Sequence, residues 1–230
     1  MSVLKCVSVV CSVALLMACS SAPKIMSQPK PRSGFLPNYD VLHSVASPSA
    51  DARIWRYRKA GGSHGAYNAV ILDPIQLNRG SYSTEISPEV VAQMVAALQQ
   101  SMREAVDDRG DIRIVSQPGP GVLRIAVGIT GAETSADSLK PWNFTPIGFA
   151  ANSAAYVAGV NEKTPTLLVE SRFTDSRTQE FIGGGVITIQ GESFRTASGS
   201  VEAFTNMARK VVRVAMETSA TQAPAMNTQK

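Results

Sequence analysis

The sequence predicts an α+β fold, a two-layer sandwich in which two amphipathic helices cover one face of a largely antiparallel sheet. Two stretches place apolar residues at helical spacing, and the segments around them are short runs with strand patterning, separated by Gly, Pro and Asp turns. Consecutive strands joined by hairpins pair in antiparallel fashion, and an amphipathic helix buries its apolar stripe against another layer. A single domain of this class accounts for the pattern.

The predicted strands are short apolar or alternating runs, and they cover residues 53–58, 67–72, 111–116, 122–130, 166–173 and 181–190. The first alternates basic with apolar residues, which favours a strand with one solvated face. Pro118–Gly121 predicts a hairpin between the third and fourth strands, and Asp175–Thr178 predicts another between the last two. Three glycines at 183–185 indicate a bulge or a close approach of another backbone.

The first helix has a clear start, because Ser87 can cap it, Pro88 suits its first position and Glu89 meets the positive end of its dipole. Gly110 is predicted to end it with a positive φ. The second helix is predicted to begin at about Ser200. The apolar stripes of the two helices are Val91, Met94, Val95, Leu98, Met102 and Ala105, and Phe204, Met207, Ala208, Val211 and Ala215.

The N-terminus has the pattern of a bacterial export signal. Lys5 precedes an apolar run over 7–17, which is too short to cross ~30 Å of hydrocarbon as a helix. The run closes at Leu16-Met17-Ala18-Cys19, which resembles the lipobox of bacterial lipoproteins. The resemblance implies that Cys19 becomes the mature N-terminus, linked by a thioether to diacylglycerol. The alternative is an ordinary secretory peptide whose cleavage site carries a cysteine.

The residue after the cysteine bears on the destination. Ser20 stands where an inner-membrane retention signal would place Asp, so the resemblance implies a lipid-anchored outer-membrane protein that faces the periplasm. The chain then divides into four parts. They are a signal peptide (1–18), a flexible Pro- and Ser-rich tether (19–33), a single domain (34–217) and a polar, disordered tail (218–230).

Composition narrows the classes of function. The 22 Lys and Arg residues and 18 Asp and Glu residues give a net charge of +4, without the basic clusters of nucleic-acid-binding proteins, so no nucleic-acid partner is predicted. Cys6 and Cys11 lie in the expected signal peptide and Cys19 would carry lipid, so the mature chain would have no disulfide and no thiol nucleophile. His43 and His64 are well separated, so we expect no metal site and no cofactor. Gly61-Gly62-Ser63-His64-Gly65 is interpreted as a loop that connects strands rather than as a catalytic loop, and no catalytic residue is predicted.

A second resemblance covers the mature domain. Gly34-Phe35-Leu36-Pro37-Asn38-Tyr39 forms a Gly-Phe-Leu-x-x-Tyr signature soon after Cys19, and Tyr67 leads into the run 70–74 before the Pro-Gly-Pro-Gly turn. Together these motifs resemble a family of bacterial lipoproteins known only as a domain of unknown function. The resemblance implies an outer-membrane lipoprotein and transfers no catalytic residue.

The segment 142–160 is the best candidate for binding. It is apolar, rich in small residues and nearly uncharged, a composition typical of internal packing, a protein interface or a membrane contact. The predicted partner-binding residues are Trp142, Phe144, Phe149 and Tyr156.

These patterns favour a non-catalytic, lipid-anchored module that binds an envelope protein or a cell-wall partner, and they leave the oligomeric state open. Two alternatives also stay open: a hydrolase of an envelope substrate, and a carrier of a lipid or other apolar ligand between the sheet and the helices. The carrier requires a cavity between the two layers. A deep pocket with convergent polar groups would favour either alternative.

Overall fold

The computed structural model describes residues 24–60, 67–78, 85–136 and 161–221 of the 230-residue chain. Its elements in chain order are α1 (Lys24–Ser27), β1 (His43–Val45), β2 (Ala52–Arg58), β3 (Ala69–Leu72), β4 (Gln76–Leu77), α2 (Pro88–Asp107), β5 (Arg113–Ile114), β6 (Val122–Ala136), β7 (Lys163–Asp175), β8 (Phe181–Gln190) and α4 (Ala197–Thr221). These strands form one sheet in the order β1-β2-β8-β7-β6-β3-β5, and β4 also pairs with β6.

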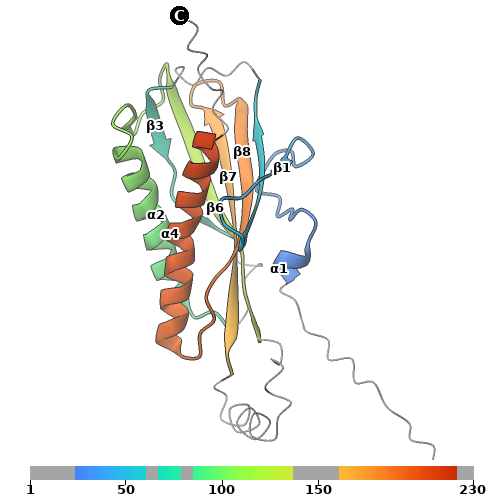
Figure 1. The fold of residues 1–230 in the computed structure, drawn as a ribbon. Helices are drawn as coiled ribbons and strands as arrows, with labels where there is room; N and C mark the ends of the chain where they lie inside the picture. The colour runs from blue at the N-terminus through green and yellow to red at the C-terminus, as the bar shows by residue number, and fades with distance from the viewer. Residues whose placement is uncertain (1–23, 61–66, 79–84, 137–160, 222–230) are drawn as a thin grey trace, which may run out of the picture.

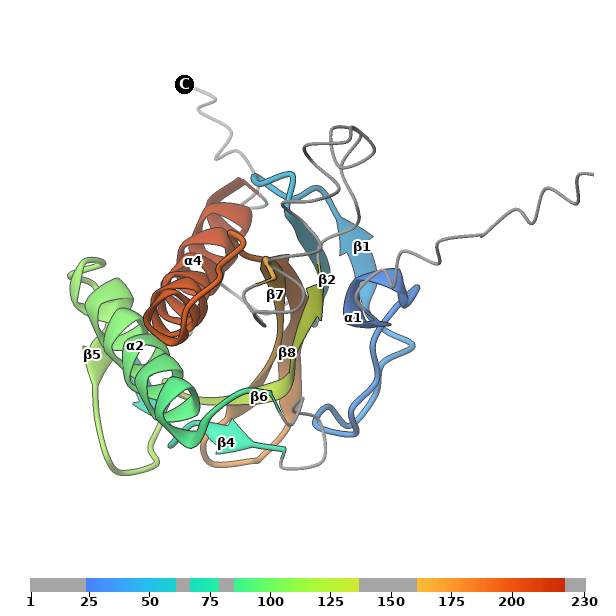
Figure 2. The same ribbon diagram turned by 90° about the horizontal axis from the view of Figure 1, so that it is seen from below.

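The helices α2 and α4 lie side by side on one side of this sheet, and α1 lies on the other (Figures 1 and 2). The strands β1, β2, β8, β7 and β6 pair in antiparallel fashion, whereas β3, β4 and β5 run parallel to their partners. The predicted α+β sandwich, with two helices on one face of a largely antiparallel sheet, is confirmed.

The hairpin predicted through residues 175–178 is present as β7 and β8. Asp175 organises its turn, because its Oδ1 atom accepts the backbone N–H groups of Arg177 and Thr178, both at 2.9 Å. Such a local side-chain bond to the backbone is the reason that Asp favours turns.

The hairpin predicted around Pro118–Gly121 is wrong. The strand β3 lies between β5 and β6 and pairs with both in parallel, so the turn residues connect two strands that are not neighbours. The loop passes the start of β3, where the N–H of Asn68 donates to the carbonyl of Gly121 at 3.0 Å. A turn motif reports that the chain changes direction, but it does not report whether another strand occupies the space between its arms.

The main core fills the space between the sheet and the two long helices. Ser87 caps α2 as predicted, since its Oγ atom accepts the N–H of Val90 at 3.3 Å. Met94 and Leu98 are buried as predicted, whereas Val91, Val95, Met102 and Ala105 are only partly buried. The buried face of α2 is completed by Val90 and Ala97. The buried apolar residues of α4 are Ala203, Phe204, Met207, Ala208, Val211 and Val214.

The three glycines of β8 sit where neighbouring backbones come close. A Cβ atom at Gly184 would lie 2.6 Å from the carbonyl oxygen of Ser171, and one at Gly185 would lie 3.0 Å from that of Trp55. Both distances are shorter than a normal contact, so any side chain would push β8 away from its neighbours. The close approach of another backbone, which the sequence offered as one interpretation, is therefore confirmed, and a register shift beside Gly183, between Phe173 and Thr174, shows an irregularity of the ladder there as well.

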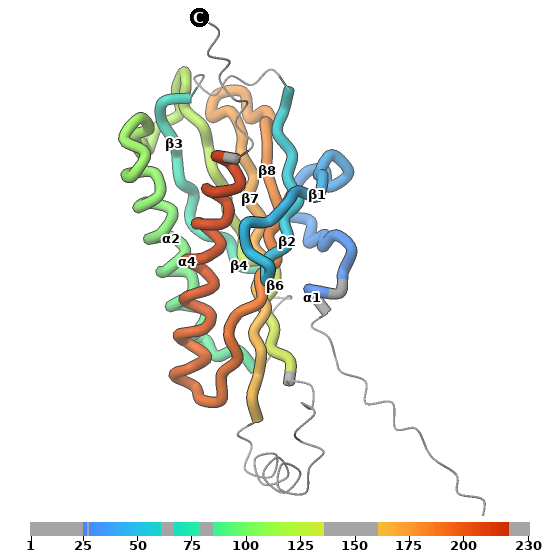
Figure 3. Tube along the Cα trace, in the orientation of Figure 1, coloured from blue at the N-terminus to red at the C-terminus, as the bar shows by residue number. Residues whose placement is uncertain are grey.

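A second, smaller core lies on the other face of the sheet. We name residues 24–42 the N-terminal strap; its course along this face can be followed in Figure 3. Ile25, Leu36, Tyr39 and Leu42 of the strap are buried there. The C-terminal part of the expected tether thus lies on the sheet. At the other end of the chain α4 continues to Thr221, so the first residues of the expected tail are helical.

Candidate functional site

The residues predicted to carry lipid or bind a partner fall outside the described ranges. Cys19 belongs to the stretch 1–23, and Trp142, Phe144, Phe149 and Tyr156 belong to 137–160. Their roles stay predictions. Within the described ranges, two kinds of feature are candidates for function: the contact of the strap with the sheet, and the cavities along α4.

A single tyrosine organises the motif at residues 34–39. Tyr39 is buried, and its hydroxyl donates a hydrogen bond to Oε2 of Glu170 at 2.6 Å. The hydroxyl oxygen of Tyr39 also accepts the backbone N–H groups of Ser33, Gly34 and Leu36, at 3.2, 2.9 and 3.2 Å. Gly34 has a φ of 88°, a conformation that glycine adopts without strain, and this lets the chain fold round the hydroxyl. The motif is therefore a compact loop closed on the sheet.

Glu170 of β7 is fully buried beneath this loop. Its second oxygen, Oε1, accepts the hydroxyl of Thr130 at 2.8 Å, so both carboxyl oxygens are hydrogen-bonded. Burial of a carboxyl group is costly unless such partners are supplied. The strap supplies one of them, so the strap and the buried glutamate stabilise each other.

The aromatic residue of the motif has a defined seat next to this network. The guanidinium carbon of Arg172 lies 5.4 Å from the centre of the Phe35 ring, a cation–π arrangement. A Cβ atom at Gly128 would lie 2.8 Å from the same ring. Glycine at that position leaves the room that Phe35 fills.

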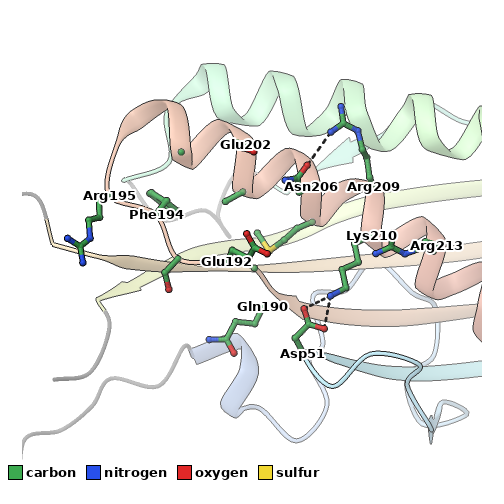
Figure 4. A pocket seen from close by; sticks show the side chains of 15 residues that line it. Asp51, Gln190, Glu192, Phe194, Arg195, Glu202, Asn206, Arg209, Lys210 and Arg213 are labelled. Carbon is green, nitrogen blue, oxygen red and sulfur yellow. Dashed lines mark hydrogen bonds and ion pairs between the residues drawn. The ribbon is translucent and has the colours of Figure 1, made fainter. Parts of the chain in front are cut away.

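A polar groove of about 540 Å³ runs between α4 and the segment 190–195 that leads into it (Figure 4). Lys210 reaches across it and donates to both carboxylate oxygens of Asp51, at 2.6 and 2.8 Å. Burial raises the pKa of Asp51, but hydrogen bonds from Lys210 and Ser49 outweigh that effect and hold the pKa below its usual value. An ionised carboxylate neutralised by lysine is a weak base, so the pair suits a structural link between α4 and the start of β2.

A second cavity, of about 490 Å³, lies between the sheet and the C-terminal turns of α4. Its walls are mainly apolar, and Met216 at its edge is one of two large apolar side chains that are exposed in the described part of the chain. The apolar lining residues are Ile112, Leu123, Phe173, Ile182, Met216 and Ala220. This is the kind of space between the layers that carriage of an apolar ligand requires.

Arg56 of β2 lines this second cavity. Its Nη1 atom is buried and has no hydrogen-bond partner among the described residues. Burial lowers the pKa of Arg56, and the neighbouring positive charge of Arg58 lowers it further. Within the described ranges no Asp or Glu lines the cavity. Arg56 as a whole is partly buried, and a buried cationic nitrogen without a partner is unfavourable. Such perturbed groups concentrate at functional sites.

Arg56 was not among the predicted site residues, because the alternation over 53–58 predicted a solvated face. That expectation is wrong, since β2 lies between β1 and β8 and both of its faces are largely covered. Arg53 lies on the strap side, where it donates to the carbonyls of Met26 and Gln28 at 2.6 and 3.1 Å. The one signal available was the mixture of arginines with large aromatic residues in a short run, which is unusual for a solvated strand.

Of the two histidines, His43 is exposed on β1, and His64 lies outside the described residues. In the ranges that the structure describes, no three His, Cys, Asp or Glu side chains gather as a metal site. None of the described helices is long and apolar enough to cross a membrane.

A family model described as "Protein of unknown function (DUF3313)" matches residues 31–217. The chain belongs to this family. The match to DUF3313 covers the motif loop, the whole sheet and most of α4, and it confirms the resemblance to a family of unknown function. The DUF3313 chain is also 24% identical over 175 residues to "Uncharacterized lipoprotein YdcL" of Escherichia coli K12, which is 76% of each protein.

Solved structures with weaker similarity include several bacterial lipoproteins. The PelC dodecamer from Paraburkholderia phytofirmans is 12% identical, with 68% of the DUF3313 chain and 95% of PelC covered and a TM-score of 0.35. Lipoprotein GNA1162 from Neisseria meningitidis is 10% identical, with 67% and 99% covered and a TM-score of 0.36. Similarity at this level carries no inference about function.

Proposed function

We propose that this DUF3313 protein is an envelope lipoprotein, anchored in the outer membrane by lipid on Cys19, that faces the periplasm and binds a partner without catalysing a reaction. The motif Leu16–Cys19 supports the lipid anchor, and the name of the relative YdcL agrees with it. The observation that carries the proposal is the docking of the strap directly after the anchor site.

The strap holds the domain close to the lipidation site. Ile25 is buried against the sheet, and Lys24 is only five residues from Cys19, which limits their Cα separation to about 18 Å. A linker that stayed flexible as far as Ser33 would reach about 50 Å. A docked strap therefore keeps the domain near the membrane, an arrangement suited to a module that meets a partner at a defined height.

The anchor can be tested by fractionation of cells that express the full chain with a C-terminal tag. We expect the tagged protein in the outer-membrane fraction, a soluble periplasmic form for Cys19→Ala, and an inner-membrane form for Ser20→Asp. The Ser20→Asp variant is a matched control because it keeps the lipid and changes only the sorting residue. Recovery of the Cys19→Ala variant in the same membrane fraction as the wild type would contradict the lipid anchor.

The binding role is tested by in-cell crosslinking and purification through the same tag, with the Cys19→Ala variant beside it. One stoichiometric envelope partner or glycan fragment, lost with Cys19→Ala, is the expected result. As an internal comparison, Phe149→Asp and Tyr156→Asp should abolish this binding without unfolding the domain. Unfolding of these two variants would show that the segment packs inside, and recovery of no specific partner would overturn the proposal.

A second candidate function is supported by the cavity at the C-terminal turns of α4. Carriage of an apolar ligand needs a space between the sheet and the helices, and a cavity with mainly apolar walls and one unpartnered cation fits that need. This function does not depend on the partner sought by crosslinking, and a lipid-anchored protein could perform both.

A further inference from the structure

We propose that the cavity between the sheet and the C-terminal turns of α4 binds an amphipathic anion, whose acidic group pairs with Arg56 and whose apolar body fills the rest of the cavity. This deepens the second function above and rests on it. The ligand class is a single carboxylate or phosphate joined to an apolar chain.

Arg56 lines the cavity and has a buried guanidinium nitrogen. Its Nη1 atom is buried without a hydrogen-bond partner in the described part of the chain, and the charge that acts on its pKa, that of Arg58, has the same sign. Leaving a charged group buried and unpaired costs far more than leaving it in water. An anion at this point would offset the free-energy cost of desolvating Arg56, and its negative charge would counter the repulsion between Arg56 and Arg58.

The other cations that line the cavity, Arg58 among them, already have interactions. Lys59 is paired with Glu180, and Arg109 is paired with Asp111 through two hydrogen bonds of 3.0 Å. These pairs are exposed and contribute little binding energy of their own. The charge left for a ligand is therefore that of Arg56, whose planar guanidinium suits the two oxygens of a carboxylate or phosphate.

The cavity is lined by apolar side chains from both the sheet and α4. Leu123 and Phe173 come from the helix-facing side of β6 and β7, and Met216 comes from α4, where its side chain is 36% exposed. A volume of about 490 Å³ lies within the ~300–1,000 Å³ of ordinary ligand pockets. Free phosphate could not make use of these walls, and a neutral lipid would leave Arg56 unpaired. Both halves of the ligand are thus required.

The test uses the mature chain from residue 19 with Cys19→Ala, because this form needs no detergent, and detergent would compete for an apolar cavity. Titration calorimetry is run with dodecanoate, dodecyl phosphate, dodecanol and inorganic phosphate, each below its micelle concentration or solubility limit. We expect one-to-one binding of either or both dodecyl anions, binding of dodecanol at least tenfold weaker, and no binding of inorganic phosphate. The two dodecyl anions distinguish a fatty acid from a phospholipid-like source.

Three variants separate a ligand site from a structural arginine. Arg56→Met keeps the apolar stem and should weaken binding of the dodecyl anions about tenfold or more while leaving dodecanol unchanged. It should not lower the melting temperature of the ligand-free protein, since it removes a buried charge. Ala220→Trp should block all dodecyl ligands at the mouth of the cavity. Arg195→Met, at an exposed ion pair with Glu162 outside this cavity, is the matched control and should change nothing.

The outcomes separate the inference from the function on which it rests. If dodecanol binds as tightly as dodecanoate, or if Arg56→Met retains anion affinity within twofold, the assignment of an anion to Arg56 is overturned although carriage of an apolar ligand survives. If no dodecyl compound binds at all, both fail. A lower melting temperature for Arg56→Met without ligand would show that Arg56 is structural.

Discussion

Replacement of Tyr39 by Phe tests whether the strap is held on the sheet by one hydroxyl group. The ring and its apolar burial remain in this variant, and only the oxygen is lost. That oxygen donates to Glu170, accepts three backbone N–H groups of the motif loop and shares a further hydrogen bond with the Ser33 hydroxyl, so five described hydrogen bonds disappear together.

The expected loss in the free energy of unfolding depends on which of the former hydrogen-bond partners of Tyr39 are buried. Glu170 is fully buried and loses one of its two described hydrogen bonds, a loss of about 1.5–3 kcal/mol if the group stays unsatisfied. The N–H of Leu36 is also buried and adds about 1 kcal/mol, whereas those of Ser33 and Gly34 are only partly buried and can bind water. We expect Tyr39→Phe to lower the free energy of unfolding by about 2–4 kcal/mol.

The assay is urea unfolding of the mature Cys19→Ala chain, combined with hydrogen exchange at the backbone amides of residues 33–42. Exchange is needed because a strap that detaches alone limits the loss seen in global unfolding and appears instead as local opening. Tyr57→Phe is the matched control: Tyr57 is a half-buried tyrosine on the same face, its ring stacks on Phe181 at 5.5 Å, and its hydroxyl is not part of the Glu170 network. It should change stability by less than about 0.5 kcal/mol.

One result would refute this reasoning. If Tyr39→Phe loses less than about 0.5 kcal/mol and the exchange of the strap amides is unchanged, the hydroxyl does not hold the strap. The docked strap would then depend on apolar contacts alone, and the account of the motif given above would be wrong.

Three further outcomes follow from the same structure. Gly184→Ala should lower the free energy of unfolding by about 1–3 kcal/mol, because its Cβ would lie 2.6 Å from the backbone of β7. Gly119→Ala is the control and should be tolerated, since the nearest atom to its Cβ would lie at 3.5 Å. Equal urea midpoints for the two variants would contradict this prediction. Ser87→Ala should lose about 1 kcal/mol of stability through the missing N-cap of α2, and an unchanged melting temperature would count against the cap. The lowered pKa of Asp51 means that its pair with Lys210 contributes stability that is full above the usual carboxyl pKa and is lost as the pH falls through the folded value. Asp51→Asn should therefore be less stable than wild type at pH 7, by no more than about 0.5–1 kcal/mol because the pair is about one-third exposed. The difference should disappear as the pH falls through the lowered pKa of Asp51.

Elements that depend on interactions between residues close in the sequence could be predicted from the sequence. The start of α2 at Ser87-Pro88 is a capping signal confined to a few neighbouring residues, and the turn at Asp175 is built by one carboxylate bonding to the next amides. The class of the fold also followed, since two amphipathic helices and several hairpin-like runs leave few ways to bury their apolar faces. The candidate site was not predicted in the same way: the binding residues chosen from composition lie outside the described ranges, and the cavity with Arg56 did not appear in any motif.

What the sequence by itself determined, then, is the two long helices with their apolar stripes, most of the strands and the N-terminal pattern that ends at Cys19, whereas α1, β1 and β4 were not predicted. Only the tertiary structure decided that β3 enters between β5 and β6, that the strap covers the second face through Tyr39 and Glu170, and that Arg56 lines a cavity. The reason is the separation along the sequence of the residues that interact. Capping, turn chemistry and periodicity act within a few residues, whereas Tyr39 and Glu170 are separated by 131 residues. Contacts of that kind are selected by the packing of the whole sheet, so the faces on which Glu170 and Arg56 lie become known only when all strands are in place.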